Sequence, residues 1–227
     1  MSYDFDFSFL WDYDSELLYG VWLTWVMTLS AILPGFALGT SCALAALHGP
    51  TWLRRLATAY VEGVRNTPLV IQVFWLFFGL SVLNVHISAT AAAITALVVN
   101  VGAYTAEIMR AGFETIPKGQ TEAAACLAMT PAQQIWNVEL PQAVERMYPA
   151  LVSQFVLMML ATSIMSQISA PELTGVGYQI QSTTFRGFEV YIVIAVIYLI
   201  LASLLRLVLL GAAALLFPRR RRLKTPL

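Results

Sequence analysis

The sequence predicts an all-α integral membrane protein with five transmembrane helices, and its composition and its long apolar stretches are the two observations behind this prediction. Of the 227 residues, 59% are hydrophobic and 11% are charged, and the mean hydropathy is +0.72. A soluble domain of this length would need many more charges on its surface. Five apolar stretches approach the length of about 20 residues that a helix needs to cross a hydrocarbon core of roughly 30 Å. The stretches lie at residues 21–47, 69–83, 88–106, 148–168 and 190–217.

The apolar stretches run without the strict alternation of barrel strands, which favours helices over a membrane β-barrel. The second stretch is the shortest, and we expect part of residues 60–68 to extend it. The last stretch is long enough to tilt or to project beyond the lipid.

The distribution of lysine and arginine predicts the orientation, because cytoplasmic connections carry an excess of both. The expected outer connections contain only Arg186, and the N-terminal segment is acidic. The basic residues of the other connections and of the C-terminal segment are Arg54, Arg55, Arg65, Arg110, Lys118, Arg146, Arg219–Arg222 and Lys224. The N-terminus is therefore predicted outside and the C-terminus in the cytoplasm. We expect an external amphipathic segment at 1–18, a transmembrane domain at 19–217 and a basic cytoplasmic tail at 218–227.

The segment 122–141, EAAACLAMTPAQQIWNVELP, is polar, helix-prone and predicted to face the cytoplasm. Thr130 suits an N-cap, Pro131 the first helical position, and Gln133 the third position of a capping box. Small residues crowd the start of the segment. The pattern predicts two short helices that meet at an angle and present a face that another protein can approach closely.

This segment resembles the EAA loop of ABC-transporter permeases. Glu122, Ala123, Ala124, Leu140 and Pro141 match its pattern, and Ala128 stands at the position of its glycine. The stretches VEGVRNTPLVIQVFW (61–75), AYTAEIMRAGFETIPKGQTEAA (103–124) and TTFRGFEVYIVIAVIYLIL (183–201) resemble the histidine/glutamate/glutamine-type branch of polar amino-acid permeases. The resemblance covers nearly the whole chain and implies the type I importer (MetI-like) permease fold, with a coupling loop at about 107–146.

The resemblance also implies a function: the transmembrane subunit of an ATP-driven importer for polar amino acids in a bacterial inner membrane. A P-loop pattern GxxxxGK[ST] is absent from the sequence, so we expect this chain to bind no cofactor and a partner ATPase dimer to bind ATP and Mg²⁺. The implied further partners are an extracytoplasmic solute-binding protein and a second permease subunit. The implied ATPase-coupling residues are Gly119, Glu122, Ala123, Ala124, Ala128, Leu140 and Pro141.

Alanine at position 128 alters the expected geometry of the loop. Alanine favours a helix over glycine by roughly 1 kcal/mol, so we expect the first short helix to run further before the bend. If the family's glycine has a positive φ, Ala128 would be strained in the same conformation.

Polar residues within the apolar stretches are the candidates for lining a translocation path. Asn100 and Tyr104 are four residues apart and so share one helix face. The remaining candidates are Gln154, Met159, Thr162 and Ser163. Close helix packing through hydroxyl residues is an equally good reading of Thr162 and Ser163. Glu107 and Arg110 are expected to form a local ion pair.

The positions before Thr162 are apolar here, Leu160 and Ala161, whereas many relatives carry a polar or charged pair there. A zwitterionic substrate needs partners for both of its charges. The loss of the pair favours a heterodimer with a similar permease over a homodimer. In the outer segment, Glu172 and Arg186 are candidate docking residues for the binding protein.

Two other function classes compete with the importer subunit. A stand-alone secondary transporter or channel predicts acidic ion sites within the spans, for which Glu107 is the one clear candidate. A membrane-embedded enzyme needs a cluster of catalytic residues. The sequence indicates no metal site, because Cys42 and Cys126 have no further candidate ligands beside them and the two histidines, His48 and His86, are isolated at the ends of the predicted spans.

Overall fold

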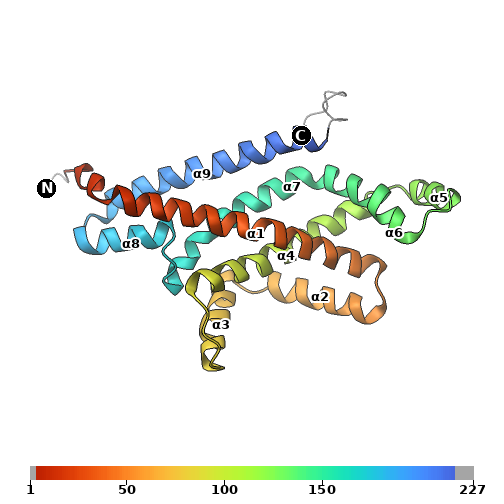
Figure 1. Cartoon of the computed structure of the whole chain (residues 1–227), viewed down its shortest axis with the longest axis horizontal. Coiled ribbons are helices and arrows are strands. Elements are labelled where there is room, and N and C mark those ends of the chain that lie inside the picture. The colour runs from red at the N-terminus through yellow and green to blue at the C-terminus, as the bar shows by residue number, and fades with distance from the viewer. Residues whose placement is uncertain (1–3, 218–227) are drawn as a thin grey trace. The chain divides into compact units, whose positions relative to one another are not determined.

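The computed structural model describes residues 4–217, and the elements within that range are helical (Figure 1). The elements are η1 (Ser8–Tyr13), α1 (Asp14–His48), α2 (Thr51–Arg65), α3 (Leu69–Val82), α4 (Ala89–Glu114), α5 (Lys118–Cys126), α6 (Pro131–Gln134), η2 (Ile135–Glu139), α7 (Leu140–Ala161), η3 (Thr162–Ile168), α8 (Leu173–Thr184) and α9 (Gly187–Leu216). The predicted tail 218–227 lies outside the described residues. η1 leads directly into α1, so the helical backbone is not interrupted at the boundary predicted near residue 18.

Within residues 4–217, four helical segments are long and apolar enough to cross a membrane: Ser8–His48, Ala89–Glu114, Pro131–Ile168 and Gly187–Leu216. The fifth apolar element is α3, whose 14 residues give a helix only about 21 Å long at 1.5 Å per residue. The four long segments and α3 coincide with the five predicted stretches. The all-α membrane fold is thereby confirmed.

The expected extension of the second stretch into residues 60–68 is wrong. α2 ends at Arg65, and α3 begins only after Pro68, which is its N-cap. Proline disfavours helical backbone in the residue before it, so the helix is interrupted at Thr67. Residues 60–65 therefore belong to the separate helix α2.

The chain divides into two compact units, which share α1, α4, α7 and α9 as continuous helices. Unit 1 comprises the residues up to Leu33, Thr67–Val98 and Phe155–Arg206. Unit 2 comprises Pro34–Asn66, Val99–Gln154 and the residues from Leu207 onward.

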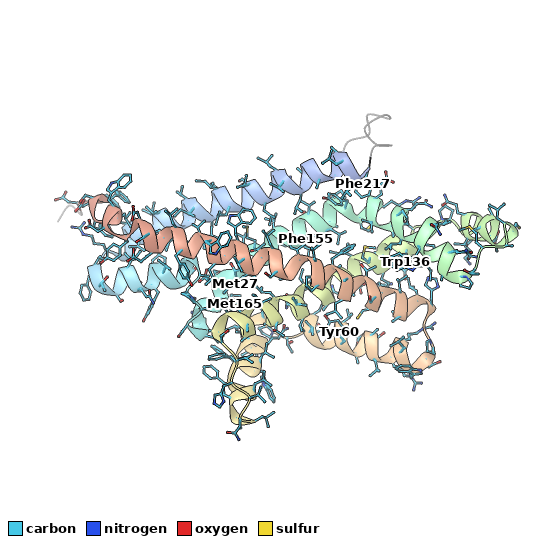
Figure 2. The ribbon with its side chains drawn as sticks, in the orientation of Figure 1. Met27, Tyr60, Trp136, Phe155, Met165 and Phe217 are labelled. Carbon is cyan, nitrogen blue, oxygen red and sulfur yellow. The ribbon has the colours of Figure 1, made fainter. Side chains whose placement is uncertain are left out.

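Unit 1 is held together by α8, which packs against α1 and α9. A Cβ added to Gly20 in α1 would lie 3.0 Å from the Leu173 Cα, and a Cβ added to Gly177 in α8 would strike the Ile194 side chain at 1.9 Å. The Leu173 backbone N–H also donates to the Thr24 hydroxyl at 3.2 Å. Small residues thus let these helices approach closely, as is usual in membrane proteins. Met27 and Met165, labelled in Figure 2, are fully buried.

In unit 2, the C-terminal part of α1 packs against α4 through two glycines. A Cβ added to Gly39 would lie 2.5 Å from the Gly102 carbonyl oxygen. The Tyr60 hydroxyl of α2 donates to the Val99 carbonyl of α4 at 2.6 Å. Tyr148 of α7 donates to the Leu209 carbonyl of α9 at 2.6 Å and packs edge-on against Phe217. These contacts fix α1, α2 and α4 to one another, and α7 to α9.

Candidate functional site: a capped helical turn and the residues that brace it

The predicted coupling residues lie in unit 2, on α5 and at the start of α7. Pro117 is the N-cap of α5, a helix of nine residues. Gly119, Glu122 and Ala123 are exposed on α5, whereas Ala124 is buried. Pro141 is exposed and Leu140 is half-buried at the beginning of α7. One face of α5 is therefore open to a partner while Ala124 anchors the helix.

The capping box predicted at Thr130 is confirmed. The Thr130 hydroxyl accepts a hydrogen bond from the Gln133 backbone N–H at 3.3 Å, and the Gln133 side-chain oxygen accepts one from the Thr130 N–H at 2.8 Å. Pro131 occupies the first turn of α6. The second helix is not a separate short one, however, because α6 continues through the π-helical η2 into α7. The turn between α5 and α6 (residues 127–130) therefore leads into a long helical segment.

Ala128 adopts the left-handed conformation, with φ 56°. The expectation that alanine lets the first helix run further is wrong, since α5 ends at Cys126. The Met129 N–H reaches back to the Ala124 carbonyl at 3.2 Å, a bond across six residues of the kind that closes helix C-termini. This closure requires a positive φ at position 128, so the chain accepts backbone strain of roughly 1–2 kcal/mol at a residue with a Cβ.

Side-chain hydrogen bonds fix the turn to its surroundings in unit 2. The Gln142 amide of α7 donates to the Gln120 side-chain oxygen of α5 at 2.6 Å. Arg146 of α7 donates to the Thr115 hydroxyl at 3.0 Å and to the Thr115 carbonyl. The Gln134 amide donates to the Met129 carbonyl at 3.0 Å, across the turn itself. A displacement of α5 should therefore be transmitted to α7.

Two large apolar side chains are exposed beside this turn. Leu127 is 77% exposed and Trp136 is 65% exposed; Trp136 is labelled in Figure 2. Both lie in the segment that the charge distribution predicts on the cytoplasmic side. Exposed apolar groups next to a rigid polar turn are typical of an interaction surface for another protein.

A second brace connects the π-helical segment η2 to the end of α1. Glu139 is only 8% exposed, and its carboxylate lies 3.1 Å from the His48 Nε2. The interpretation of His48 as an isolated side chain is therefore wrong. The two residues are 91 positions apart in the chain, so no local pattern in the sequence predicts the pair.

The predicted path residues fall into two groups. Asn100 and Tyr104 on α4 and Gln154 on α7 are half-buried in unit 2, and their role stays a prediction. In unit 1, Met159 and Thr162 are fully enclosed, and the Thr162 hydroxyl donates to the Met159 carbonyl at 2.7 Å. This favours packing over path lining for these two. The half-buried Ser163 stays a candidate.

Glu172 does not offer its charge to a docking protein. Its side chain is fully buried and caps α8 by accepting hydrogen bonds from the Thr174 and Gly175 N–H groups at 3.0 and 2.8 Å. The Tyr198 hydroxyl donates to it at 2.6 Å. Burial raises the pKa of the Glu172 carboxyl, and these hydrogen bonds oppose the rise.

Arg186 is partly exposed and pairs with Asp6 at 3.5 Å and with Glu189 at 3.3 Å. Its role in docking stays a prediction. The ion pair predicted between Glu107 and Arg110 is confirmed. Among residues 4–217, no three His, Cys, Asp or Glu side chains lie close enough together to hold a metal ion.

Comparison with known proteins decides the family. Residues 35–222 match the model of the binding-protein-dependent transport system inner membrane component. The chain belongs to that family. It is therefore a multi-pass permease subunit of a transport complex in the inner membrane.

Individual relatives agree with this assignment. The chain is 33% identical over 226 residues to the octopine transport system permease protein OccM of Rhizobium radiobacter, covering 96% of this chain and 92% of the relative. It is 32% identical to the glutamine transport system permease protein GlnP of Escherichia coli K12, with 90% and 94% coverage. A solved structure described as an amino acid ABC transporter with histidines superposes with a TM-score of 0.84 at 34% identity, covering 93% of this chain and 99% of that one. The predicted permease fold of type I importers is confirmed.

Proposed function

We propose that this permease carries polar amino acids inward and is driven by a separate ATPase that binds the α5–α6 turn. The observation that supports this most directly is the geometry of the turn: it is capped, braced against α7, and flanked by the exposed Leu127 and Trp136. A rigid element can convert the movement of a partner into movement of a transmembrane helix, whereas a flexible loop would absorb it.

The mechanism follows from these contacts. When a dimer of ATPase subunits closes on ATP and Mg²⁺, the cleft that holds α5 would move. The hydrogen bonds that Gln142 donates to Gln120 and that Arg146 donates to Thr115 would carry this movement into α7. The pair of Glu139 and His48 carries it into α1. Displacement of α7 and α1 would then alternately open the path to the outside and to the inside.

The substrate class and the other partners are inferred from the relatives and from the residues of the spans. Permeases named for octopine and for glutamine are both about one-third identical to this chain, which supports a polar amino acid or a derivative of one. A solute-binding protein would deliver it at the outer face, where Arg186 is the candidate contact. A second, similar permease would complete the path, and the apolar Leu160 and Ala161 favour a partner that supplies the charged groups.

The two cysteines of the chain allow a direct test of the docking surface. Cys126 is exposed at the end of α5, and Cys42 lies half-buried in α1. In a Cys42→Ser background, maleimide labelling of Cys126 should slow at least several-fold when the ATPase is added. The reverse variant, Cys126→Ser, reports whether Cys42 responds in the same way. Unchanged labelling of Cys126 in a complex shown by gel filtration to contain the ATPase would refute the proposed surface.

A substitution gives an independent test. Leu127→Ser should reduce co-purification of the ATPase, because it removes an exposed apolar contact. Phe185→Ser is the matched control: Phe185 is 89% exposed in the α8–α9 connection, on the predicted outer side, and its loss should leave the ATPase bound. Mass spectrometry of the purified complex also identifies the second permease. A complex with this permease alone would refute the heterodimer.

A further inference from the structure

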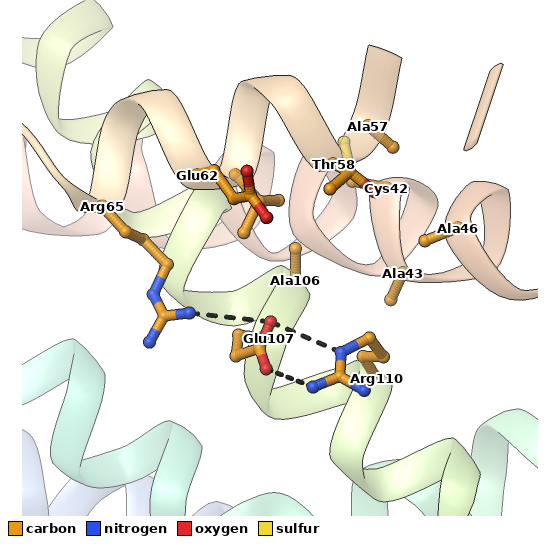
Figure 3. A pocket seen from close by; sticks show the side chains of 11 residues that line it. Cys42, Ala43, Ala46, Ala57, Thr58, Glu62, Arg65, Ala106, Glu107 and Arg110 are labelled. Atoms are coloured by element: carbon orange, nitrogen blue, oxygen red, sulfur yellow. Dashed lines mark hydrogen bonds and ion pairs between the residues drawn. The ribbon is translucent and has the colours of Figure 1, made fainter. Parts of the chain in front are cut away.

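A cavity of about 340 Å³ lies in unit 2, where α1, α2 and α4 come together (Figure 3). Its apolar wall consists of small side chains, among them Ala43, Ala46 and Ala57. Its polar wall is formed by Glu62 and Arg65 of α2 and by Glu107 and Arg110 of α4. The volume lies at the lower end of the range of small-molecule sites, so the cavity has room for one small ligand.

The charged side chains of the cavity balance each other, two carboxylates against two guanidinium groups. Glu107 lies between the two arginines: its Oε2 is 3.6 Å from the Arg65 Nη1 and 3.4 Å from the Arg110 Nε. A second bond joins Arg110 to the Glu107 Oε1, and Arg110 also binds Glu114 at 2.5 Å. Each of the three guanidinium nitrogens of Arg110 thus binds a carboxylate, as the dashed lines in Figure 3 show for Glu107.

Arg65 is held more loosely than Arg110. Its single ion pair within the described range is the 3.6 Å contact to Glu107, and its guanidinium also lies 5.5 Å from the centre of the Tyr104 ring. A guanidinium has five N–H donors. Most of those of Arg65 therefore stay available for a carboxylate placed in the cavity.

Glu62 lies one helical turn before Arg65, on the same face of α2. Across residues 4–217, the structure gives its carboxylate no ion pair and no side-chain hydrogen bond, and the residue is exposed. Figure 3 shows Glu62 and Arg65 on α2 beside the α4 residues Glu107 and Arg110. The cavity thus presents an uncompensated anion about one turn from a guanidinium with spare donors.

We propose that this cavity binds the zwitterion of a polar amino acid, with its ammonium group at Glu62 and its carboxylate at Arg65. A zwitterion needs one partner of each sign, and a carboxylate and a guanidinium on one helix face supply both. The inference builds on the proposed function, since a transported amino acid is the ligand that would reach this place. In the predicted orientation the cavity lies near the cytoplasmic ends of α1 and α4, so it takes up the amino acid from the cytoplasmic side. Its occupancy then reports the concentration of the amino acid in the cytoplasm.

The test measures binding of radiolabelled L-glutamine, L-arginine and L-glutamate to the permease–ATPase complex in lipid nanodiscs, without the solute-binding protein. We expect saturable binding of at least one of them. Glu62→Gln should weaken that binding about tenfold or more, which is the loss expected when one charged contact is removed. Arg65→Gln should do the same. Glu16→Gln, which changes an exposed carboxylate at the other end of α1, is the control and should leave binding unchanged.

Competition identifies the chemistry of the ligand. N-acetylation of the bound amino acid removes the ammonium charge, and amidation removes the carboxylate, so both derivatives should compete at least tenfold less well. Inorganic phosphate should not compete. The proposal is overturned if none of the three amino acids binds, if Glu62→Gln binds as wild type does, or if phosphate displaces the ligand.

Uptake measured in the same preparations separates this inference from the proposed function. Vesicles that contain the complete transporter, with the binding protein added, should accumulate the amino acid only with ATP. Normal uptake without amino-acid binding in the cavity would refute the cavity alone. Absence of ATP-dependent uptake would refute the importer itself.

Discussion

Gly39→Ala should destabilise the contact between α1 and α4 in unit 2. The added Cβ would lie 2.5 Å from the Gly102 carbonyl oxygen, 2.6 Å from the Thr105 Cβ and 2.8 Å from the Ala106 backbone nitrogen. Two of these neighbours are backbone atoms, which cannot rotate away. The helices would have to separate by roughly 1 Å to restore contacts of about 3.5 Å.

The magnitude combines two opposing effects. Overpacking of a close contact costs about 1–3 kcal/mol, and the better helix propensity of alanine returns up to about 1 kcal/mol. Because the contacts of 2.5–2.8 Å include two backbone atoms, the cost should lie in the upper part of this range, at about 2–3 kcal/mol, and we expect a net loss of about 1–2 kcal/mol. By the values for folded domains of 150–250 residues, this lowers the Tm by roughly 2–8 °C.

Gly63→Ala provides the matched control. Gly63 lies inside α2, and apart from its chain neighbours and its own helix backbone no atom of residues 4–217 lies within 4 Å of an added Cβ, so this substitution should leave the Tm unchanged or raise it. The assay is thermal unfolding of the detergent-purified chain, followed by tryptophan fluorescence. If Gly39→Ala raised the Tm as much as Gly63→Ala does, α1 and α4 would not be in contact at Gly39.

Three further predictions concern single contacts. Ala128→Gly should stabilise the turn by about 1 kcal/mol by relieving strain at φ 56°, whereas Ala125→Gly inside α5 should cost about as much; resistance to limited proteolysis distinguishes them. His48→Ala should cost about 1–3 kcal/mol because it leaves a buried carboxylate unpaired. The double variant His48→Ala/Glu139→Gln should be little less stable than Glu139→Gln alone in thermal unfolding; additive losses would contradict the pairing. Tyr198→Phe should cost about 1.5–3 kcal/mol by removing a donor to Glu172. Burial already raises the pKa of the Glu172 carboxyl, and loss of the donor raises it further. The difference in Tm between Tyr198→Phe and the wild type should therefore narrow as the pH falls and the carboxyl becomes protonated. A difference in Tm that stays constant across pH would argue against this.

Local chemistry allowed most of the elements to be predicted from the sequence. Long apolar runs can satisfy their backbone groups in lipid only as helices, so the membrane helices followed directly. The cap at Thr130 also followed, because the side chains that make it are three residues apart. The interruption at Thr67 could have been predicted from Pro68, which follows it. The apolar stretch 69–83 is too short to span a membrane by itself, however, and its length favoured an extension into residues 60–68.

The functional contacts between distant residues were out of reach of that reasoning. Glu172 seemed an exposed loop charge, and only the packing of α8 against α1 and α9 in unit 1 encloses it. The positive φ of Ala128 depends on how the end of α5 closes, whereas helix propensity alone favoured a longer helix.

The order of residues along this chain thus specifies a membrane permease with a capped turn that is predicted to face the cytoplasm, because apolar length, charge asymmetry and capping are properties of neighbouring residues. Only the folded chain brings Glu139 to His48, Glu172 to Tyr198, and Glu62 and Arg65 to the cavity beside Glu107. These groups come from different helices, and the helix faces that pack together determine the partner of each buried charge. The periodicity of the sequence shows which face of a helix is apolar, but not which other helix covers it.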